Sequence, residues 1–132
     1  DKRELDVLLA TGEQTTAALA AMMLIDKGYN ANSMLGHQVD ILTDSSFGDA
    51  RIKDIHVDKL KTAMSKNKII IVPGFQGADE EGHITTLGRG GSDTSAVAWA
   101  AAVKADVCAI YTDVYGVYTS DRRICPKARK LT

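Results

Sequence analysis

Residues 85–94 read Thr85-Thr86-Leu87-Gly88-Arg89-Gly90-Gly91-Ser92-Asp93-Thr94, a glycine-rich turn that runs directly into a predicted helix. Glycines occupy three of the four positions 88–91. Because glycine lacks a Cβ and adopts left-handed conformations freely, such a turn can approach a ligand closely and direct several N–H groups toward it. The positive end of the following helix dipole favours an anion at the same place.

The side chains of this turn suit the same kind of ligand. Arg89 carries a planar, permanently charged fork that can bind a carboxylate or a phosphate through two hydrogen bonds. Ser92 and Asp93 stand at the expected helix start, where they either cap the helix or face the ligand. The string is neither a dinucleotide-binding fingerprint, since Asp93 replaces the third glycine, nor a P-loop, since no Gly-Lys-Ser/Thr follows.

The elements on both sides of the turn predict a parallel sheet. A continuous apolar run at 69–72 indicates a buried strand, and 107–111 indicates a second one. Between them lies a helix over 92–104 with Ala96, Trp99, Ala100 and Val103 on one face. Strand, helix and strand form a βαβ unit. Ligands of such sheets bind beyond the carboxyl ends of the strands, where 73–77, 88–93 and 112–113 are expected to meet.

The remaining elements are shorter or less certain. A helix is expected over 13–27, with its buried stripe formed by Ala17, Ala18, Ala21, Met22 and Ile25. Residues 30–35 resemble a strand, 58–64 a short helix, and 36–49 a loop that includes a short strand near 39–42.

The composition argues against nucleic-acid-binding, membrane-spanning and disulfide-rich classes of protein. The chain has 132 residues, 45% of them hydrophobic, and a formal net charge of −1, which argues against binding nucleic acid or an anionic membrane. Two cysteines are too few for a disulfide scaffold, and Cys108 is expected to be a buried small hydrophobe. No apolar stretch is expected to span a membrane, and no signal peptide is evident. These features favour the cytoplasm.

Several strings resemble the aspartate kinases of the amino-acid kinase family. They are Leu8-Leu9-Ala10-Thr11-Gly12-Glu13, Gly74-Phe75-Gln76-Gly77, residues 85–93, and Tyr111-Thr112-Asp113-Val114-Tyr115-Gly116-Val117-Tyr118. The resemblance covers essentially the whole chain. It implies an α/β fold, a three-layer α/β/α sandwich with a mainly parallel sheet that is incomplete at both ends. It also implies transfer of the γ-phosphoryl group of ATP, with Mg²⁺, to the β-carboxylate of L-aspartate, the first step of lysine, threonine and methionine biosynthesis.

The resemblance also assigns roles to individual residues. Glu13 would hold the ammonium group of the substrate, and Arg89 its α-carboxylate, with Gly90, Gly91 and Ser92 close by. Asp93 would organise the reaction centre together with Arg89, while Phe75 either touches the substrate or packs against the sheet. Thr112, Asp113, Tyr118 and Arg123 would contact the nucleotide. No residue is predicted to bind a metal ion directly, and a homo-oligomer is expected.

The family pattern is not matched everywhere. The Lys-Phe/Tyr-Gly-Gly segment and the regulatory domains of the family do not occur in this sequence. Residues 1–132 are therefore expected to be part of a single catalytic domain and to be inactive alone. Tyr115 and Arg122 depart from the family pattern in the nucleotide segment. Two alternatives remain: a non-catalytic domain of the same fold that binds nucleotide or amino acid, and a kinase of another small acceptor.

Overall fold

A computed structural model describes residues 1–66, 68–112, 116, 118–121 and 123–131. Its helices are α1 (Lys2–Asp26), α2 (Gly36–Val39), α3 (Asp58–Met64) and α4 (Gly91–Val103). Its strands are β1 (Ala31–Ser33), β2 (Ile41–Thr43), β3 (Ile52–Ile55), β4 (Ile69–Ile71), β5 (Gln76–Ala78) and β6 (Ile84–Thr86).

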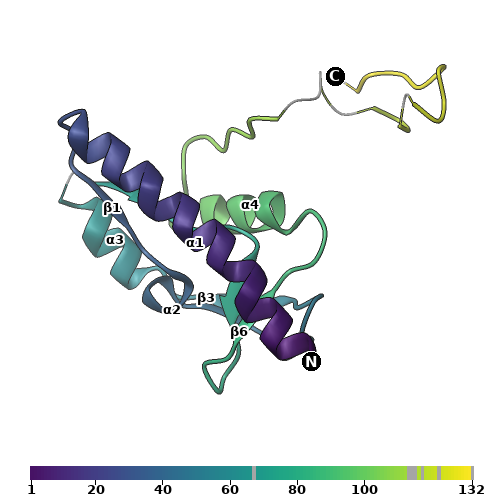
Figure 1. Ribbon diagram of the computed structural model, residues 1–132. Coiled ribbons are helices and arrows are strands. Elements are labelled where there is room, and N and C mark those ends of the chain that lie inside the picture. Colours follow the sequence, from purple (N-terminus) through teal and green to yellow (C-terminus); the bar gives the residue numbers. More distant parts are fainter. Residues whose placement is uncertain (67, 113–115, 117, 122, 132) are drawn as a thin grey trace.

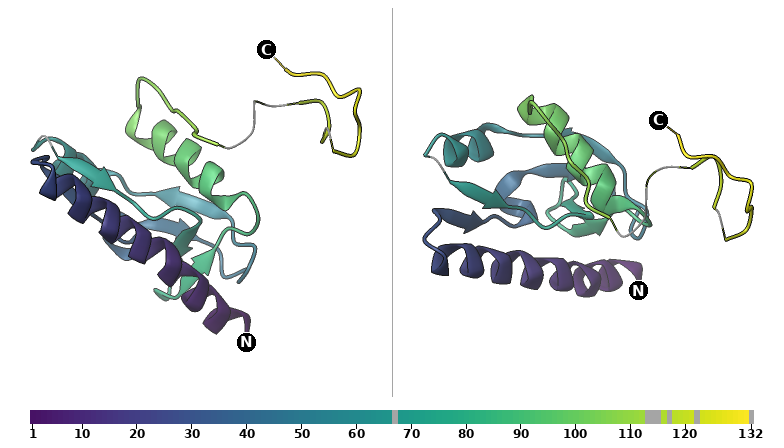
Figure 2. Two further views of the ribbon diagram at one scale, coloured as in Figure 1. Left: turned by 45° about the horizontal axis from the view of Figure 1, so that its top comes forward. Right: turned by 90° about the horizontal axis from the view of Figure 1, so that it is seen from above.

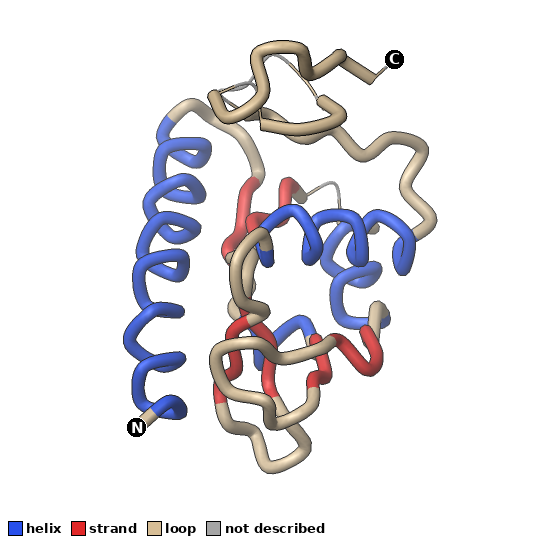
Figure 3. The backbone as a smooth tube through the Cα atoms, turned by 90° about the vertical axis from the view of Figure 1, so that its right-hand side faces the viewer, coloured by secondary structure: helices blue, strands red, loops and turns tan. Residues whose placement is uncertain are grey.

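Helices cover both faces of the strands, which makes three layers. α1 packs against β1, β4 and β6, whereas α3 packs against β4 and α4 against β3 and β5. Figure 2 shows α1 on one side of the strands and α3 and α4 on the other, and the tube in Figure 3 shows the same separation from another direction. The α/β class predicted from the sequence is therefore confirmed.

The strands form a parallel pair and a mixed sheet. β1 pairs with β4 in parallel, with Ala31 opposite Ile69. The second sheet has the order β3-β2-β5-β6, in which β2 and β5 are parallel while the β2–β3 and β5–β6 pairs are antiparallel. The loops after β2, β4 and β6 carry the residues that matter below.

α1 begins earlier than the sequence predicted. Its first turn is capped by Asp1, whose carboxylate accepts a hydrogen bond from the Arg3 backbone N–H (2.8 Å). The face against the strands is lined by small side chains and one carboxylate: Asp6, Ala10, Ala17 and Ala21. The expected burial of Ala18, Met22 and Ile25 is wrong, because these side chains are exposed and the helix approaches the strands through its small buried residues.

α1 also changes one expectation about membranes. By length and composition it is apolar enough to cross a membrane, contrary to the sequence-based expectation. In this structure, however, it covers the strands (Figure 1). The carboxylate of Asp6 is buried on that side of the helix. Its place in the fold is that of a covering helix.

Two further expectations are wrong after α4. Residues 107–111 form no strand, and Cys108 is exposed rather than buried. The segment leads away from the strands (Figure 1), so its backbone meets no neighbouring strand and its apolar side chains stay exposed. β4 is also less buried than the apolar run at 69–72 predicted, since Ile69 is 43% exposed and β4 pairs only with β1 among the described residues.

Candidate functional site

The glycine-rich turn adopts the left-handed geometry that its sequence predicts. Gly88 and Gly90 have φ values of 71° and 77°, which residues with a Cβ adopt rarely. The Gly91 backbone N–H donates to the Gly88 carbonyl (3.1 Å) and closes the turn directly before α4. The backbone can therefore deliver its N–H groups and the helix end to one point.

Three exposed polar side chains surround this turn. Arg89, Ser92 and Asp93 all face solvent, and within the described part of the chain none of their side chains forms a hydrogen bond or an ion pair. The cap of α4 is Gly90, and no side chain caps the helix. The possibility that Ser92 or Asp93 serves as a cap is thus excluded, and both remain free to meet a ligand.

The loop after β4 packs directly beneath the turn. A Cβ at Gly91 would lie 2.8 Å from Cβ of Leu87 and 3.0 Å from Cδ2 of Phe75, closer than such atoms approach. A Cβ at Gly74 would likewise lie 3.1 Å from the Ser95 hydroxyl. Gly91 thus leaves no space for a side chain and Gly74 leaves little, so the loop and the start of α4 are closely packed.

Phe75 occupies a conformation that is unusual for its residue type. Its φ of 67° is left-handed, and the backbone is fixed on both sides. Its N–H donates to the Ser95 hydroxyl (3.1 Å), and its carbonyl accepts from the Leu87 N–H (2.9 Å). The ring is half-buried beside Gly91, so Phe75 packs against the start of α4 and keeps part of its surface at the turn.

Glu13 is carried by α1, the helix that packs against β6. It lies in the middle of the helix, on the same side as the buried Asp6 and Ala17, because seven and four residues correspond to about two turns and one turn. Its side chain is nevertheless exposed. The neighbouring Gln14 donates to the side chain of Gln76 (2.9 Å), and Gln76 in turn donates to the Gly74 carbonyl (3.3 Å). α1 is therefore tied, one residue after Glu13, to the loop that carries Phe75.

The sequence analysis missed three residues that organise this region. Gln76 is 1% exposed and bonds to both α1 and Gly74, while Asp6 is fully buried beneath the turn. Asp49, on the loop between β2 and β3, places Oδ1 2.9 Å from where a Cβ would stand at Gly88. An acidic residue within an apolar helical stripe was the available signal for Asp6, but the predicted helix began only at Glu13.

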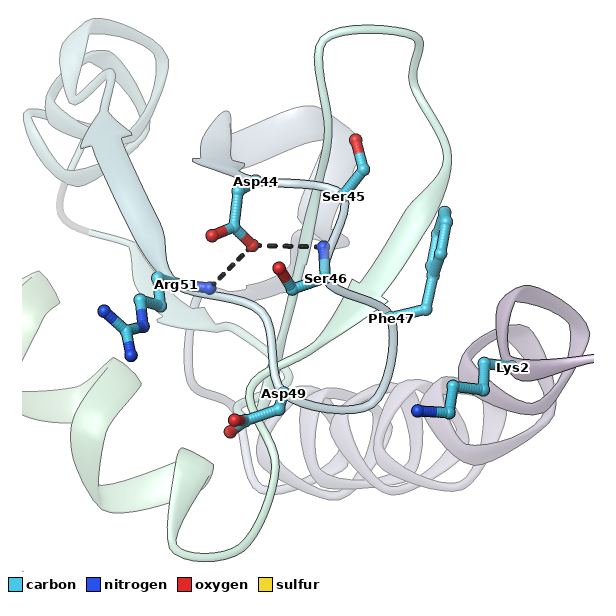
Figure 4. Close-up of a pocket in the computed structure, with 7 residues that line it drawn as sticks. All are labelled: Lys2, Asp44, Ser45, Ser46, Phe47, Asp49 and Arg51. Atoms are coloured by element: carbon cyan, nitrogen blue, oxygen red, sulfur yellow. Dashed lines mark hydrogen bonds between the residues drawn. The ribbon is translucent and has the colours of Figure 1, made fainter.

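A cavity of about 540 Å³ lies beside the turn (Figure 4). Its lining combines both charge signs, hydroxyls and one ring: Lys2, Asp44, Ser45, Ser46, Phe47, Asp49 and Arg51. The backbone N–H groups of Arg51 and Ser46 donate to Asp44 (both 3.1 Å) and hold the pKa of its carboxyl below the ordinary value. Asp44 thus shapes the loop, and the exposed groups around the turn lie outside this cavity.

The predicted nucleotide residues lie apart from the turn. Thr112 is exposed beyond α4, and Asp113, Tyr115 and Arg122 lie outside the described residues. Tyr118 pairs with Lys130 in an isolated bridge in the C-terminal segment, which extends away from the strands (Figure 1).

Arg123 belongs to the same segment. Its guanidinium and backbone N–H bond to Asp121 and hold the pKa of that carboxyl below the ordinary value. The structure does not bring Tyr118 and Arg123 to the glycine-rich turn.

The donor groups determine how a Mg²⁺ ion would be held. Among the described residues, no three His, Cys, Asp or Glu side chains come together to bind a metal ion. Asp93 is the acidic residue of the first turn of α4. A single carboxylate fits an ion held chiefly by phosphate oxygens and water, as Mg²⁺ commonly is.

The fold and the glycine-rich site define the class of protein. The family model for the amino acid kinase family matches residues 1–132, so the chain belongs to that family.

Within the family, the similar curated proteins are aspartokinases. The chain is 58% identical over 130 residues to an aspartokinase of Bacillus sp. (strain MGA3), covering 98% of this chain and 32% of that protein. It is also 58% identical over 129 residues to an aspartate kinase of Pseudomonas putida (strain KT2440), covering 98% and 31%. The chain therefore spans about a third of the length of these relatives.

A solved structure supports the same fold. E. coli aspartokinase III, in complex with aspartate and ADP in its R-state, superposes with a TM-score of 0.81 at 30% identity. The match covers 99% of this chain and 30% of that one.

Proposed function

We propose that this protein transfers the γ-phosphoryl group of ATP to the β-carboxylate of L-aspartate, giving 4-phospho-L-aspartate and ADP. The central support is the glycine-rich turn, where Arg89, Ser92 and Asp93 are exposed and free of partners within the described chain. The similarity to aspartokinases over nearly the whole chain supports the same activity.

Arg89 and Glu13 are the proposed anchors of the acceptor amino acid. The guanidinium of Arg89 matches the α-carboxylate, and the carboxylate of Glu13 matches the ammonium group. Both side chains are exposed on elements that meet at the loop of Phe75. Two anchors of opposite charge leave the β-carboxylate as the free end of the substrate, which fits its role as nucleophile.

The reaction needs positioning more than proton transfer. A carboxylate with a reference pKa of about 3.9 is already ionised at neutral pH. One of its oxygens attacks the γ-phosphorus, and the bond to the ADP oxygen breaks with its electron pair, so no proton moves. The turn N–H groups, the start of α4 and Arg89 counter the negative charge that two anions bring together.

ATP is the proposed second substrate, with Mg²⁺ bound to its phosphates and Asp93 oriented toward the metal-bound water. Gly90, Gly91 and Ser92 are proposed to lie along the acceptor, with Phe75 beside it. For Thr112, Asp113, Tyr118 and Arg123 the nucleotide role is carried by the family resemblance, and it requires the segment after α4 to approach the turn.

The setting of the enzyme follows from the same proposal. Residues 1–132 would form part of one catalytic domain, in a cytoplasmic protein that acts as a homo-oligomer. The outer face of α1 supports association, since it exposes Leu8, Leu19 and Met22 at 59–67% of their surface.

The direct test is MgATP-dependent phosphoryl transfer by the full gene product that contains these residues. The acceptors would be L-aspartate, L-glutamate, N-acetylglutamate and uridylate, with residues 1–132 assayed alongside. We expect transfer to aspartate alone, and none by residues 1–132. Transfer to another acceptor with none to aspartate would replace the substrate. No transfer to any acceptor by a folded, nucleotide-binding protein would favour the non-catalytic role.

A further inference from the structure

Asp6 is a carboxylate buried beneath the glycine-rich turn. Its residue is 0% exposed, and both of its oxygens are used. Oδ2 accepts hydrogen bonds from the backbone N–H groups of Thr86 (2.8 Å) and Gly48 (3.0 Å), and Oδ1 accepts one from the Thr86 hydroxyl (2.8 Å). Three segments far apart in the sequence are thus joined by one side chain.

The three donors at this site match a carboxylate better than its amide. Three donors converge on Asp6, and no cation pairs with it among the described residues. A carboxylate accepts at both oxygens, whereas an asparagine accepts only at its one oxygen and would turn an N–H group toward the Thr86 hydroxyl, which would then have to accept instead of donate. Since burying a charge without a counter-ion is unfavourable unless hydrogen bonds compensate, the structure has to hold all three partners in place.

The partners of Asp6 lead directly to the turn. Thr86 ends β6 two residues before Gly88 and three before Arg89. Gly48 precedes Asp49, and both contact the position where a Cβ would stand at Gly88. The carboxylate therefore holds the strand that enters the turn and the loop that supports it.

Asp6 also fixes α1, which carries Glu13. The two residues are seven apart on one side of the helix, about 10 Å along its axis. We infer that Asp6 is a positioning residue that sets the separation of Glu13 and Arg89, so that one amino acid can contact both. This inference rests on the proposed function, in which these two side chains bind the ammonium and carboxylate groups of the acceptor.

The inference predicts a loss of two-point recognition when Asp6 is changed. Succinate lacks the ammonium group of aspartate, and β-alanine lacks its α-carboxylate, so each can use only one anchor. In Asp6→Asn we expect the KM for L-aspartate to rise roughly ten- to hundredfold, the range for a charged hydrogen bond. The KM for ATP and the inhibition constants of succinate and β-alanine should change less than about twofold.

The test uses the full gene product, with a matched control on the same helix. Asp26→Asn makes the same chemical change at an exposed position of α1 and should leave every constant unchanged. If Asp6→Asn does not fold, Thr86→Val removes only the hydroxyl donor and should raise the aspartate KM about two- to tenfold with the inhibitors unaffected. The inference would be overturned if, in a folded variant, the KM for aspartate and the inhibition constants of both inhibitors changed equally. It would also be overturned if none of these constants changed.

Amide hydrogen exchange separates this inference from the proposed function. In Asp6→Asn, the amides of residues 86–91 and 47–49 should exchange faster, while those in the middle of α4 should not. If the unsubstituted protein does not phosphorylate aspartate, the proposed function fails. The positioning role of Asp6 is then tested by amide hydrogen exchange alone. Unchanged exchange at 86–91 would then overturn the positioning role, and faster exchange would support it.

Discussion

Phe75 shows how a single residue can reveal a constrained site. A bulky side chain at a φ of 67° is a strained conformation, which persists only where the surroundings hold it. Here the Ser95 hydroxyl and the Leu87 N–H fix its backbone, and Gly91 leaves space for its ring. The sequence allowed either packing or substrate contact for Phe75, and the structure shows the packing.

Replacing Arg89 is expected to weaken the binding of L-aspartate while leaving that of ATP largely unchanged. Arg89→Ala should raise the KM for L-aspartate about ten- to hundredfold, because a charge-assisted hydrogen bond contributes roughly 1.5–3 kcal/mol. The KM for ATP should change much less. Steady-state kinetics with each substrate varied in turn would check this, and equal losses for both substrates would assign Arg89 to the phosphates instead.

A single methyl group added at Gly91 is expected to lower the free energy of unfolding. In Gly91→Ala the new Cβ would meet Leu87 and Phe75, and such overpacking costs about 1–3 kcal/mol. Gly12→Ala is the matched control, since Gly12 lies within α1 with nothing nearby, and there alanine should stabilise the helix by about 0.5–1 kcal/mol. Urea denaturation measures both, and equal effects would contradict the tight packing at Gly91.

The sequence predicted some residues of the candidate site but not others. Arg89, Ser92 and Asp93 are neighbours in the chain, so the glycine-rich string alone indicated that they meet. Asp6 could not be found this way, because its partner Thr86 is 80 residues distant and only the folded chain brings them together.

At the scale of elements, the hairpin of β5 and β6 depends on a buried carboxylate. Burial raises the pKa of Asp79, but hydrogen bonds from the His83 N–H, the Ser45 hydroxyl and the His83 ring outweigh it and lower the pKa below its ordinary value of 3.8. Asp79 also accepts a hydrogen bond from the Glu81 N–H (3.1 Å) and so closes the hairpin.

The sign of its pH dependence follows from that lowered pKa. Asp79 stabilises the fold fully above the ordinary pKa of 3.8, and this stabilisation is lost as the pH falls through the lower, folded-state value. Asp79→Asn should therefore lower stability at neutral pH and flatten its decline in acid. Thermal unfolding between about pH 3 and pH 7 would check this. A slope as steep as that of the unsubstituted chain would contradict the role of Asp79.

The elements were predicted unevenly, for physical reasons. The helices at 58–64 and 91–103 and the strand at 69–71 had clear signals in apolar spacing or capping, whereas the strand at 31–33 had only a weak one. β5 was missed because Gly77 resembles a loop residue. In the structure Gly77 instead allows β2 to approach, since a Cβ would lie 2.8 Å from the Ile41 carbonyl oxygen. The apolar pattern at 107–111 predicted a strand, but a strand also needs a partner.

At the scale of the whole molecule, three loops and one helix converge on a single region. The loops after β2, β4 and β6 meet around Gly88 and Gly91, and α1 is joined to them through Asp6 and Gln76. The three-layer class was predicted from the family resemblance, whereas the βαβ pattern relied on a strand at 107–111 that does not form. The contribution of α1 was not predicted, because its long-range hydrogen bonds leave no local signal in the sequence.

We propose, at this scale, that the chain carries the acceptor site of an aspartate kinase. The most direct measurement replaces the matching 130 residues of the Bacillus sp. (strain MGA3) aspartokinase with this chain and assays phosphoryl transfer to L-aspartate. We expect kcat/KM for aspartate within about tenfold of the host enzyme, a difference under about 1.4 kcal/mol. A folded hybrid that binds ATP but transfers no phosphoryl group to aspartate would contradict it.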